Sequence, residues 1–119
     1  MNIAIDIDGT ITKNPKLFLE LMLKWKFGGN EVVLLTGNGD GTMTRIARLV
    51  QLKELGIPTY AYTELVIARD VQNLGEEGVA KEKARLLIIL STDIFIDDNL
   101  DNIREAKKRN PKLLVFEPY

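Results

Sequence analysis

The chain has 119 residues, the size of one ordinary domain, and its 28% charged and 45% hydrophobic residues are a normal globular balance. The formal net charge of −1 gives no general attraction to nucleic acid or to an anionic membrane surface. The sequence contains no cysteine and no histidine, which excludes thiolate nucleophiles, imidazole bases and metal sites built from Cys or His.

Apolar runs that predict strands alternate with segments of helical spacing along the whole chain. Strands are predicted at 3–7, 32–35, 57–62, 94–96 and 113–116. Helices are predicted from Asn14-Pro15 to Gly28, from Met43 to Leu55, over 76–90 and over 100–109. The segment 63–75 is ambiguous, because 65–68 fits a strand or a short helix. This alternation predicts right-handed crossovers and one three-layer α/β/α Rossmann-like domain over 1–119, with a five-stranded parallel sheet.

Polar residues follow three of the predicted strands, at Asp6, Thr36 and Asp97-Asp98. In parallel sheets ligands bind beyond the carboxyl ends of the strands, at the point where the strand order reverses. We therefore expect these side chains to meet at one edge of the sheet.

The most informative segment is Asp6-Ile7-Asp8-Gly9-Thr10, at the end of the first apolar run. A carboxylate at position 6 can attack phosphorus and form a covalent intermediate. Asp8 can protonate the leaving oxygen and then activate the water that hydrolyses the intermediate. The alternative is a simple turn, since Asp and Gly favour turns, but the position after a strand favours the functional interpretation.

Thr36-Gly37-Asn38 follows the second strand and precedes a helix. A hydroxyl and a backbone N–H at this place suit a phosphate oxygen, although Thr is also a common helix cap. The glycine-rich run 37–41 invites a dinucleotide-binding interpretation, which we reject because the glycine spacing is wrong and the run follows the second strand.

Lys81 and Lys83 lie near the start of the helix that precedes the fourth strand. A cation that reaches Asp6 would neutralise part of the charge that carboxylates and a phosphate bring together. We favour Lys81 for this role and assign Lys83 to substrate binding; the alternative is that both lie on a solvated helix face.

Asp97 and Asp98 follow the fourth strand, and paired acids after a buried strand are costly unless a cation meets them. A Mg²⁺ ion held by Asp6, the main-chain carbonyl of Asp8 and the acid pair fits the preference of this ion for oxygen. Which of Asp97 and Asp98 contacts the metal is left open, and one of them is expected to cap the next helix.

The order of these four segments along the chain resembles the haloacid dehalogenase-like superfamily. The family's DxDxT loop is similar to 6–10, its Ser/Thr to Thr36, its lysine to Lys81 or Lys83, and its acid pair to Asp97-Asp98. The resemblance implies that Asp6 is the nucleophile, Asp8 the general acid/base and Mg²⁺ the cofactor, with Gly9, Thr10, Gly37 and Asn38 beside the substrate. An Asp two places after the nucleophile is typical of the phosphatase branches. The chain departs from the family in having Asp-Asp instead of Gly-Asp and in leaving no room for a cap domain.

The sequence thus predicts a capless, Mg²⁺-dependent phosphatase that acts on a small phosphometabolite or nucleotide. A phosphorylated macromolecule is the alternative substrate, and a catalytically idle phosphate- or metal-binding module is the alternative function. A signalling receiver domain is disfavoured because the third predicted strand ends without an acid. Capless proteins of this type use a bulky substrate or a neighbouring subunit of a homo-oligomer as their lid. Without a signal peptide or a membrane span, we expect a cytoplasmic protein that does not bind membranes. Lys13, Asn14, Lys16, Asp40, Tyr60 and Tyr62 are expected at the rim of the site.

Overall fold

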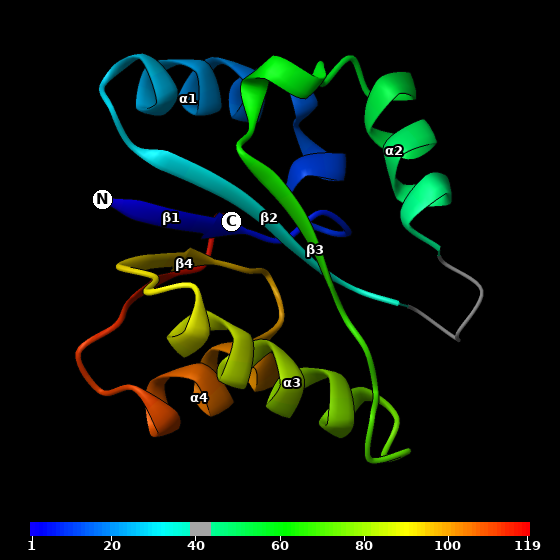
Figure 1. The fold of residues 1–119 in the computed structure, drawn as a ribbon, viewed down its shortest axis with the longest axis vertical. Coiled ribbons are helices and arrows are strands. Elements are labelled where there is room, and N and C mark those ends of the chain that lie inside the picture. The colour runs from blue at the N-terminus through cyan, green and yellow to red at the C-terminus, as the bar shows by residue number, and fades with distance from the viewer. Residues whose placement is uncertain (39–43) are drawn as a thin grey trace.

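The protein consists of a parallel five-stranded sheet with helices on both faces (Figure 1). Its structure is a computed structural model that describes residues 1–38 and 44–119. The strands, in spatial order β3-β2-β1-β4-β5, are β1 (Asn2–Ile5), β2 (Glu31–Gly37), β3 (Glu64–Ala68), β4 (Ile94–Ile96) and β5 (Leu114–Phe116). The helices are α1 (Pro15–Phe27), α2 (Arg45–Glu54), α3 (Glu76–Ile89) and α4 (Leu100–Arg109), with short 3₁₀ helices η1 (Ile11–Lys13) and η2 (Thr59–Ala61). The predicted fold class is confirmed.

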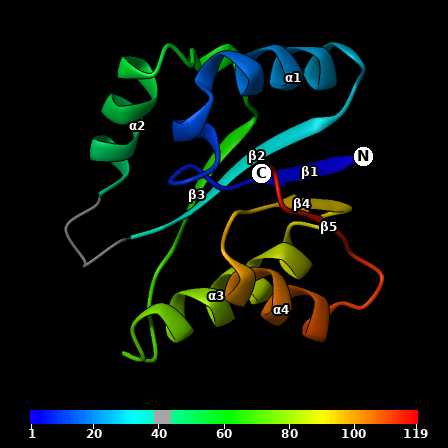
Figure 2. The same cartoon turned by 180° about the vertical axis from the view of Figure 1, so that it is seen from behind.

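The sheet separates two apolar cores, and Figure 2 shows α1 and α2 on one face and α3 and α4 on the other. Because side chains alternate along a strand, Ile3 and Ile5 of β1 enter the core under α1 and α2 while Ala4 enters the core under α3 and α4. Both faces of the central strands are therefore covered, which is why β2 reads as a continuous apolar run.

Side chains at the helix starts satisfy the backbone N–H groups that a first turn leaves unpaired. Asn14 accepts from the N–H of Leu17 and precedes Pro15, whose fixed φ suits the first helical position. Asn99 accepts from the first turn of α4. Asn99 is the cap of this helix, and not Asp97 or Asp98 as the sequence suggested.

The third strand is the element that the sequence analysis placed wrongly. The strand predicted at 57–62 is instead η2, and β3 runs over Glu64–Ala68, the segment left ambiguous. Pro58 explains the difference, because it has no N–H to donate to a ladder and its carbonyl accepts from Ala61 to close the turn. The sheet resumes at Thr63, whose N–H donates to Val32.

The strand order reverses between β1 and β4, which places the expected ligand site beyond the carboxyl ends of these two strands. Within the two described ranges, no further domain is inserted between the elements of the sheet. No helix in those ranges is both long and apolar enough to cross a bilayer. The predicted start of the second helix at Met43, the run 39–41 and Asp40 lie outside the described residues.

Candidate active site

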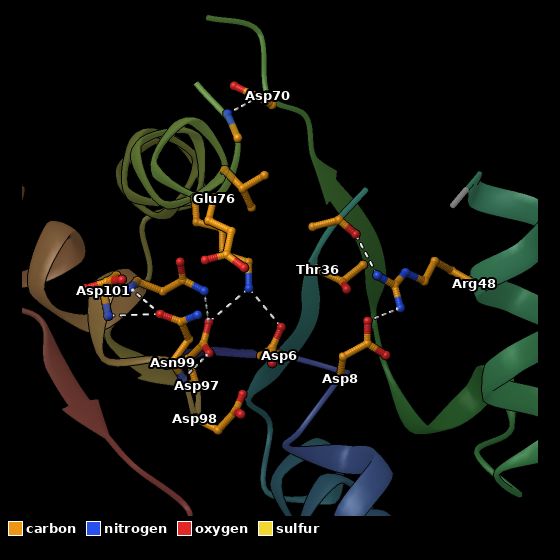
Figure 3. Close-up of a pocket in the computed structure, with 15 residues that line it drawn as sticks. Asp6, Asp8, Thr36, Arg48, Asp70, Glu76, Asp97, Asp98, Asn99 and Asp101 are labelled. Atoms are coloured by element: carbon orange, nitrogen blue, oxygen red, sulfur yellow. Dashed lines mark hydrogen bonds and ion pairs between the residues drawn. The ribbon is translucent and has the colours of Figure 1, made fainter. Parts of the chain in front are cut away.

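Acids from the ends of β1 and β4 meet at the reversal of strand order. The N–H of Asp6 donates to the carbonyl of Ile96 at 2.9 Å, which ties the end of β1 to the end of β4 and sets Asp6 beside Asp97. Carboxylate oxygens of Asp6, Asp97 and Asp98 lie within 4.8 Å of one another, so the expected meeting of these acids is confirmed. They line one side of a cavity of about 420 Å³ (Figure 3).

Lys83 joins two of these acids in a buried ion-pair triad. Its Nζ donates to Asp6 Oδ1 at 2.8 Å and to Asp97 Oδ2 at 2.9 Å, and the Lys83 side chain is only 2% exposed. Burial alone would lower the pKa of Lys83, but the two carboxylates outweigh it and raise that pKa, so the amine is charged. Burial raises the pKa of Asp6 to about 7 even though Lys83 opposes the shift.

The preference for Lys81 as the inward lysine is wrong. Lys81 pairs with Glu77 at 3.1 Å on the partly exposed side of α3. Successive helix positions turn by about 100°, so residues two apart point in nearly opposite directions. Lys83 shares its face with the buried residues Ala80 and Leu87, and this face decides which lysine reaches Asp6.

Asp97 and Asp98 occupy different environments. Asp97 is fully buried and accepts from Lys83, from Asn102 Nδ2 at 2.9 Å and from the N–H of Asn99 at 2.9 Å. Asp98 is exposed, and its hydrogen-bond contact among the described residues is the Thr10 hydroxyl at 3.4 Å. Asp97 is therefore occupied with holding the cluster together, whereas Asp98 keeps oxygens free for a metal ion.

The turn after Asp6 brings the backbone against Asp98. Gly9 has a positive φ of +80°, and a Cβ at this position would overlap the Asp98 carboxylate. The Thr10 hydroxyl lies 3.4 Å from both Asp6 Oδ2 and Asp98 Oδ1. Gly9 and Thr10 therefore contact the acids from behind the cavity wall, and neither residue lines the cavity.

Asp8 lies across the cavity from Asp97 and Asp98, next to α2 (Figure 3). Arg48 Nη1 donates to its Oδ2 at 2.7 Å, and Gln51 Nε2 donates to its Oδ1 at 2.9 Å. Partial burial would raise the pKa of Asp8, but the hydrogen bonds from Gln51 and Arg48 prevail and lower it. Asp8 is therefore an ionised carboxylate at neutral pH.

Thr36 and Gly37 line the cavity at the end of β2, as expected, and Asn38 does not. Thr36 is buried, and its hydroxyl has no hydrogen-bond partner within the described ranges, so it is available to a ligand. Of the residues expected at the rim, none within the described ranges lines the cavity: Lys13, Asn14, Lys16, Tyr60 and Tyr62. Tyr60 lies in η2 and Tyr62 directly after it, not at the carboxyl end of a strand.

Arg48 and Asn102 are site residues that sequence reasoning missed. Arg48 lies one turn before Leu52, and both are buried on α2, so a charged residue on the apolar face of a helix was the available signal. Asn102 lies in the first turn of α4, three residues after its cap, where nothing in the sequence distinguishes it from a solvated residue.

The chain matches no protein-family profile and no curated protein sequence. Among solved structures, its fold is similar to a chain in the structure of the Pnkp1/Rnl/Hen1 RNA repair complex, with a TM-score of 0.69 and 18% sequence identity. The similarity covers 98% of this chain but 41% of that chain, so this protein spans less than half of its neighbour's length. At this identity the likeness establishes the shared fold.

Proposed function

We propose that the protein is a capless phosphatase of the haloacid dehalogenase-like type, which hydrolyses phosphomonoesters through an aspartyl-phosphate on Asp6 with the help of Mg²⁺. The observation that carries the proposal is the group of three carboxylates formed by Asp6, Asp97 and Asp98, with the charged Lys83 bound to one oxygen of Asp6. The proposal treats residues 1–119 as one such domain.

The donor set fits Mg²⁺. The available ligands are carboxylate oxygens, which this ion prefers, and Asp98 has few competing hydrogen bonds. Asp6 and Asp98, with the main-chain carbonyl of Asp8, would hold the ion, while Asp97 acts through Lys83 and Asn102. When bound, the ion would supply positive charge for the phosphoryl oxygens in the transition state.

In the first half-reaction, an Asp6 oxygen attacks phosphorus, the bond from phosphorus to the ester oxygen breaks, and the leaving oxygen takes a proton. Asp8 is ionised, so this proton arrives with the phosphomonoester, whose second pKa is about 6, and passes to the leaving oxygen through Asp8. Lys83 keeps a positive charge beside Asp6 throughout. The Thr36 hydroxyl donates to a phosphoryl oxygen.

In the second half-reaction, water attacks the phosphorus of the aspartyl-phosphate and gives its proton to Asp8. The bond between phosphorus and Asp6 breaks, which releases phosphate and restores the Asp6 carboxylate, and Asp8 then loses its proton to the departing phosphate or to water. The lowered pKa of Asp8 leaves it ionised at neutral pH, the state that this base step requires.

The charge of the cavity favours a small substrate over a polynucleotide. Among the described residues, the lining carries two cations, Lys83 and Arg48, and both are already paired with carboxylates. Acids predominate among the remaining charged lining residues: Asp70, Glu76, Asp98 and Asp101. A polynucleotide would bring several further phosphates to this acidic rim. Because the structural neighbour comes from an RNA repair complex, an RNA with a terminal phosphate is the macromolecular substrate whose hydrolysis should be compared with that of small phosphate esters.

Phosphate release from 4-nitrophenyl phosphate and from a panel of phosphometabolites tests the proposal. We expect release that requires Mg²⁺, stops with EDTA and is abolished by Asp6→Asn. Glu20→Gln, which changes an exposed acid on α1, is the matched control and should retain full activity. Activity that survives Asp6→Asn would contradict the aspartyl-phosphate route, and an inactive wild-type protein that still binds Mg²⁺ and phosphate would favour the idle binding module.

A further inference from the structure

We propose that Arg48, together with Gln51, is a positioning residue that aims the Asp8 carboxylate at the leaving group. This inference rests on the proposed phosphatase function and concerns the same site. It makes α2 a part of the catalytic apparatus, although α2 contributes none of the four segments on which the family resemblance depends.

Asp8 is an exposed side chain that is held in one orientation. Its side chain is 59% exposed, so water alone would leave it free to rotate. Instead Arg48 Nη1 binds one carboxylate oxygen at 2.7 Å and Gln51 Nε2 binds the other at 2.9 Å. Two donors from one helix, each on a different oxygen, fix the plane of the carboxylate.

Arg48 is itself rigidly held. Its Nη1 also donates to Gln51 Oε1 at 2.9 Å, and its Nη2 donates to the carbonyl of Gly37 at 2.7 Å. The guanidinium therefore connects the loop after β1, the end of β2 and the first turns of α2. Any shift of α2 or of the end of β2 is transmitted to Asp8 through these bonds.

Fold stability does not account for a buried guanidinium here. The side chain is 1% exposed on a helix face that otherwise carries Leu52, and burying a charge is costly unless it is fully paired. The Nε of Arg48 is buried with no hydrogen-bond partner in the described part of the chain. An apolar residue at this position would avoid both costs, so the guanidinium is explained by its contact with Asp8.

Asp8 and Lys83 have different roles because they lie on different sides of Asp6. Figure 3 shows Asp6 between two groups, with Asp97 and Asp98 on one side and Asp8 with Arg48 on the other. Lys83 and the acids act on the nucleophile, whereas Arg48 acts on the group that moves the proton. Proton transfer depends steeply on placement, and misplacement by about 1 Å can cost about 100-fold in rate.

The test is a series of phosphomonoesters whose leaving groups range from nitrophenol to a simple alkyl alcohol. A poor leaving group needs the proton from Asp8, and nitrophenolate departs without it. We compare kcat/KM, which covers the steps up to departure of the alcohol and leaves out the later hydrolysis of the aspartyl-phosphate, in which Asp8 serves every ester alike. For Gln51→Leu and Arg48→Lys we expect kcat/KM on the alkyl ester to fall about 10- to 100-fold and kcat/KM on the nitrophenyl ester to change by less than about threefold.

Arg45→Lys is the matched control, because Arg45 lies on the same helix and donates to the carbonyl of Leu65, away from Asp8. It should leave the dependence on the leaving group unchanged. In Asp8→Asn, adding Gln51→Leu should cause no further loss with any ester, since the residue on which Gln51 acts is already gone. Arg48→Ala removes a buried charge and can unfold the chain, so the main test uses Gln51→Leu, which changes a half-buried side chain.

Equal losses of kcat/KM on all esters, or no loss, in both Gln51→Leu and Arg48→Lys would overturn the inference while leaving the phosphatase in place. A wild-type protein that releases phosphate from no ester refutes the proposed function instead. In that case crystal structures of Gln51→Leu and Arg48→Lys decide on the positioning itself: a reoriented or disordered Asp8 carboxylate supports it, and an unchanged one refutes it.

Discussion

Replacing Lys83 with Met removes the only cation that the structure places between Asp6 and Asp97, among the residues it describes. Met fills much of the same volume without the charge, so the variant leaves two buried carboxylates facing each other. Removing one partner of a buried ion pair costs about 3–5 kcal/mol, because the remaining charge is desolvated without compensation. Total stabilities of small domains are about 5–15 kcal/mol, so the expected loss is a large fraction.

The loss converts to a melting temperature through the entropy of unfolding, which is about 2.1 cal/mol/K per residue. For a chain of 119 residues this gives roughly 0.25 kcal/mol/K, and therefore a decrease of about 12–20 °C for Lys83→Met. Lys81→Met is the control, since it deletes a partly exposed pair with Glu77 whose worth is at most about 0.5 kcal/mol, or about 2 °C.

The deficit of Lys83→Met should depend on pH. Burial raises the pKa of Asp6 to about 7 in the folded protein, compared with 3.8 for an ordinary Asp, and loss of Lys83 removes an interaction that lowers it. Between these pH values the folded state binds more protons than the unfolded state, so the free energy of unfolding falls as pH rises. The deficit should therefore be larger at pH 8 than at pH 5.

Thermal unfolding followed by circular dichroism in EDTA at pH 5 and pH 8 measures both effects. A Lys83→Met protein that melts within 2 °C of Lys81→Met at pH 8 would refute the reasoning about the triad.

Further predictions concern the metal site and pH. Gly9→Ala should abolish the rise in melting temperature expected from the proposed Mg²⁺ site, because its Cβ displaces the Asp98 carboxylate. In EDTA the melting temperature of this variant should fall by about 4–8 °C, from left-handed strain of about 1–2 kcal/mol, and a Mg²⁺ titration of the melting temperature checks both effects. Asp98→Asn should lose the stabilisation expected from Mg²⁺ but keep the stability of the metal-free protein. Asp97→Asn should be less stable even in EDTA, because it disturbs the contacts with Lys83, Asn99 and Asn102. Denaturant unfolding with and without Mg²⁺ separates the two variants, and the reverse pattern would contradict the assignment of Asp98 to the metal. In metal-free wild-type protein, the free energy of unfolding should fall as pH rises from about 4 to about 7, through the raised pKa of Asp6, and urea titrations that show an increase would contradict this.

The parts of the fold that the sequence predicted are those with strong local signals. The helix over 100–109 and the strand over 94–96 have the bounds that the pattern indicated. The third strand was missed because 57–62 and 64–68 are both apolar enough for a strand, and the choice depends on which one pairs with β2. Pro58 was the local warning, since a proline within an apolar run restricts that run to an edge strand or argues against a strand.

The site was predictable where it depends on strand ends and unpredictable where it depends on helix rotation. Asp6 and Asp97 meet because parallel strands end at the same edge, and the sequence shows both ends. Lys81 and Lys83 lie on different faces of α3, and the sequence does not show which of these faces packs on the sheet. The charged residues around both lysines resemble the surface of a solvated helix. Arg48 was missed because its partner Asp8 is distant in sequence and no spacing rule relates them.

The pairing of β1 with β4 joins Ile3 to Ile94, so the two halves of the acidic cluster come from segments that are far apart in the sequence. During synthesis the loop that carries Asp6 is made long before the segment that carries Asp97 and Asp98, and in refolding the closure of so long a loop is slow. Ion affinity should consequently appear late, in step with the last central strand, and any species that binds Mg²⁺ tightly has already assembled the middle of its sheet.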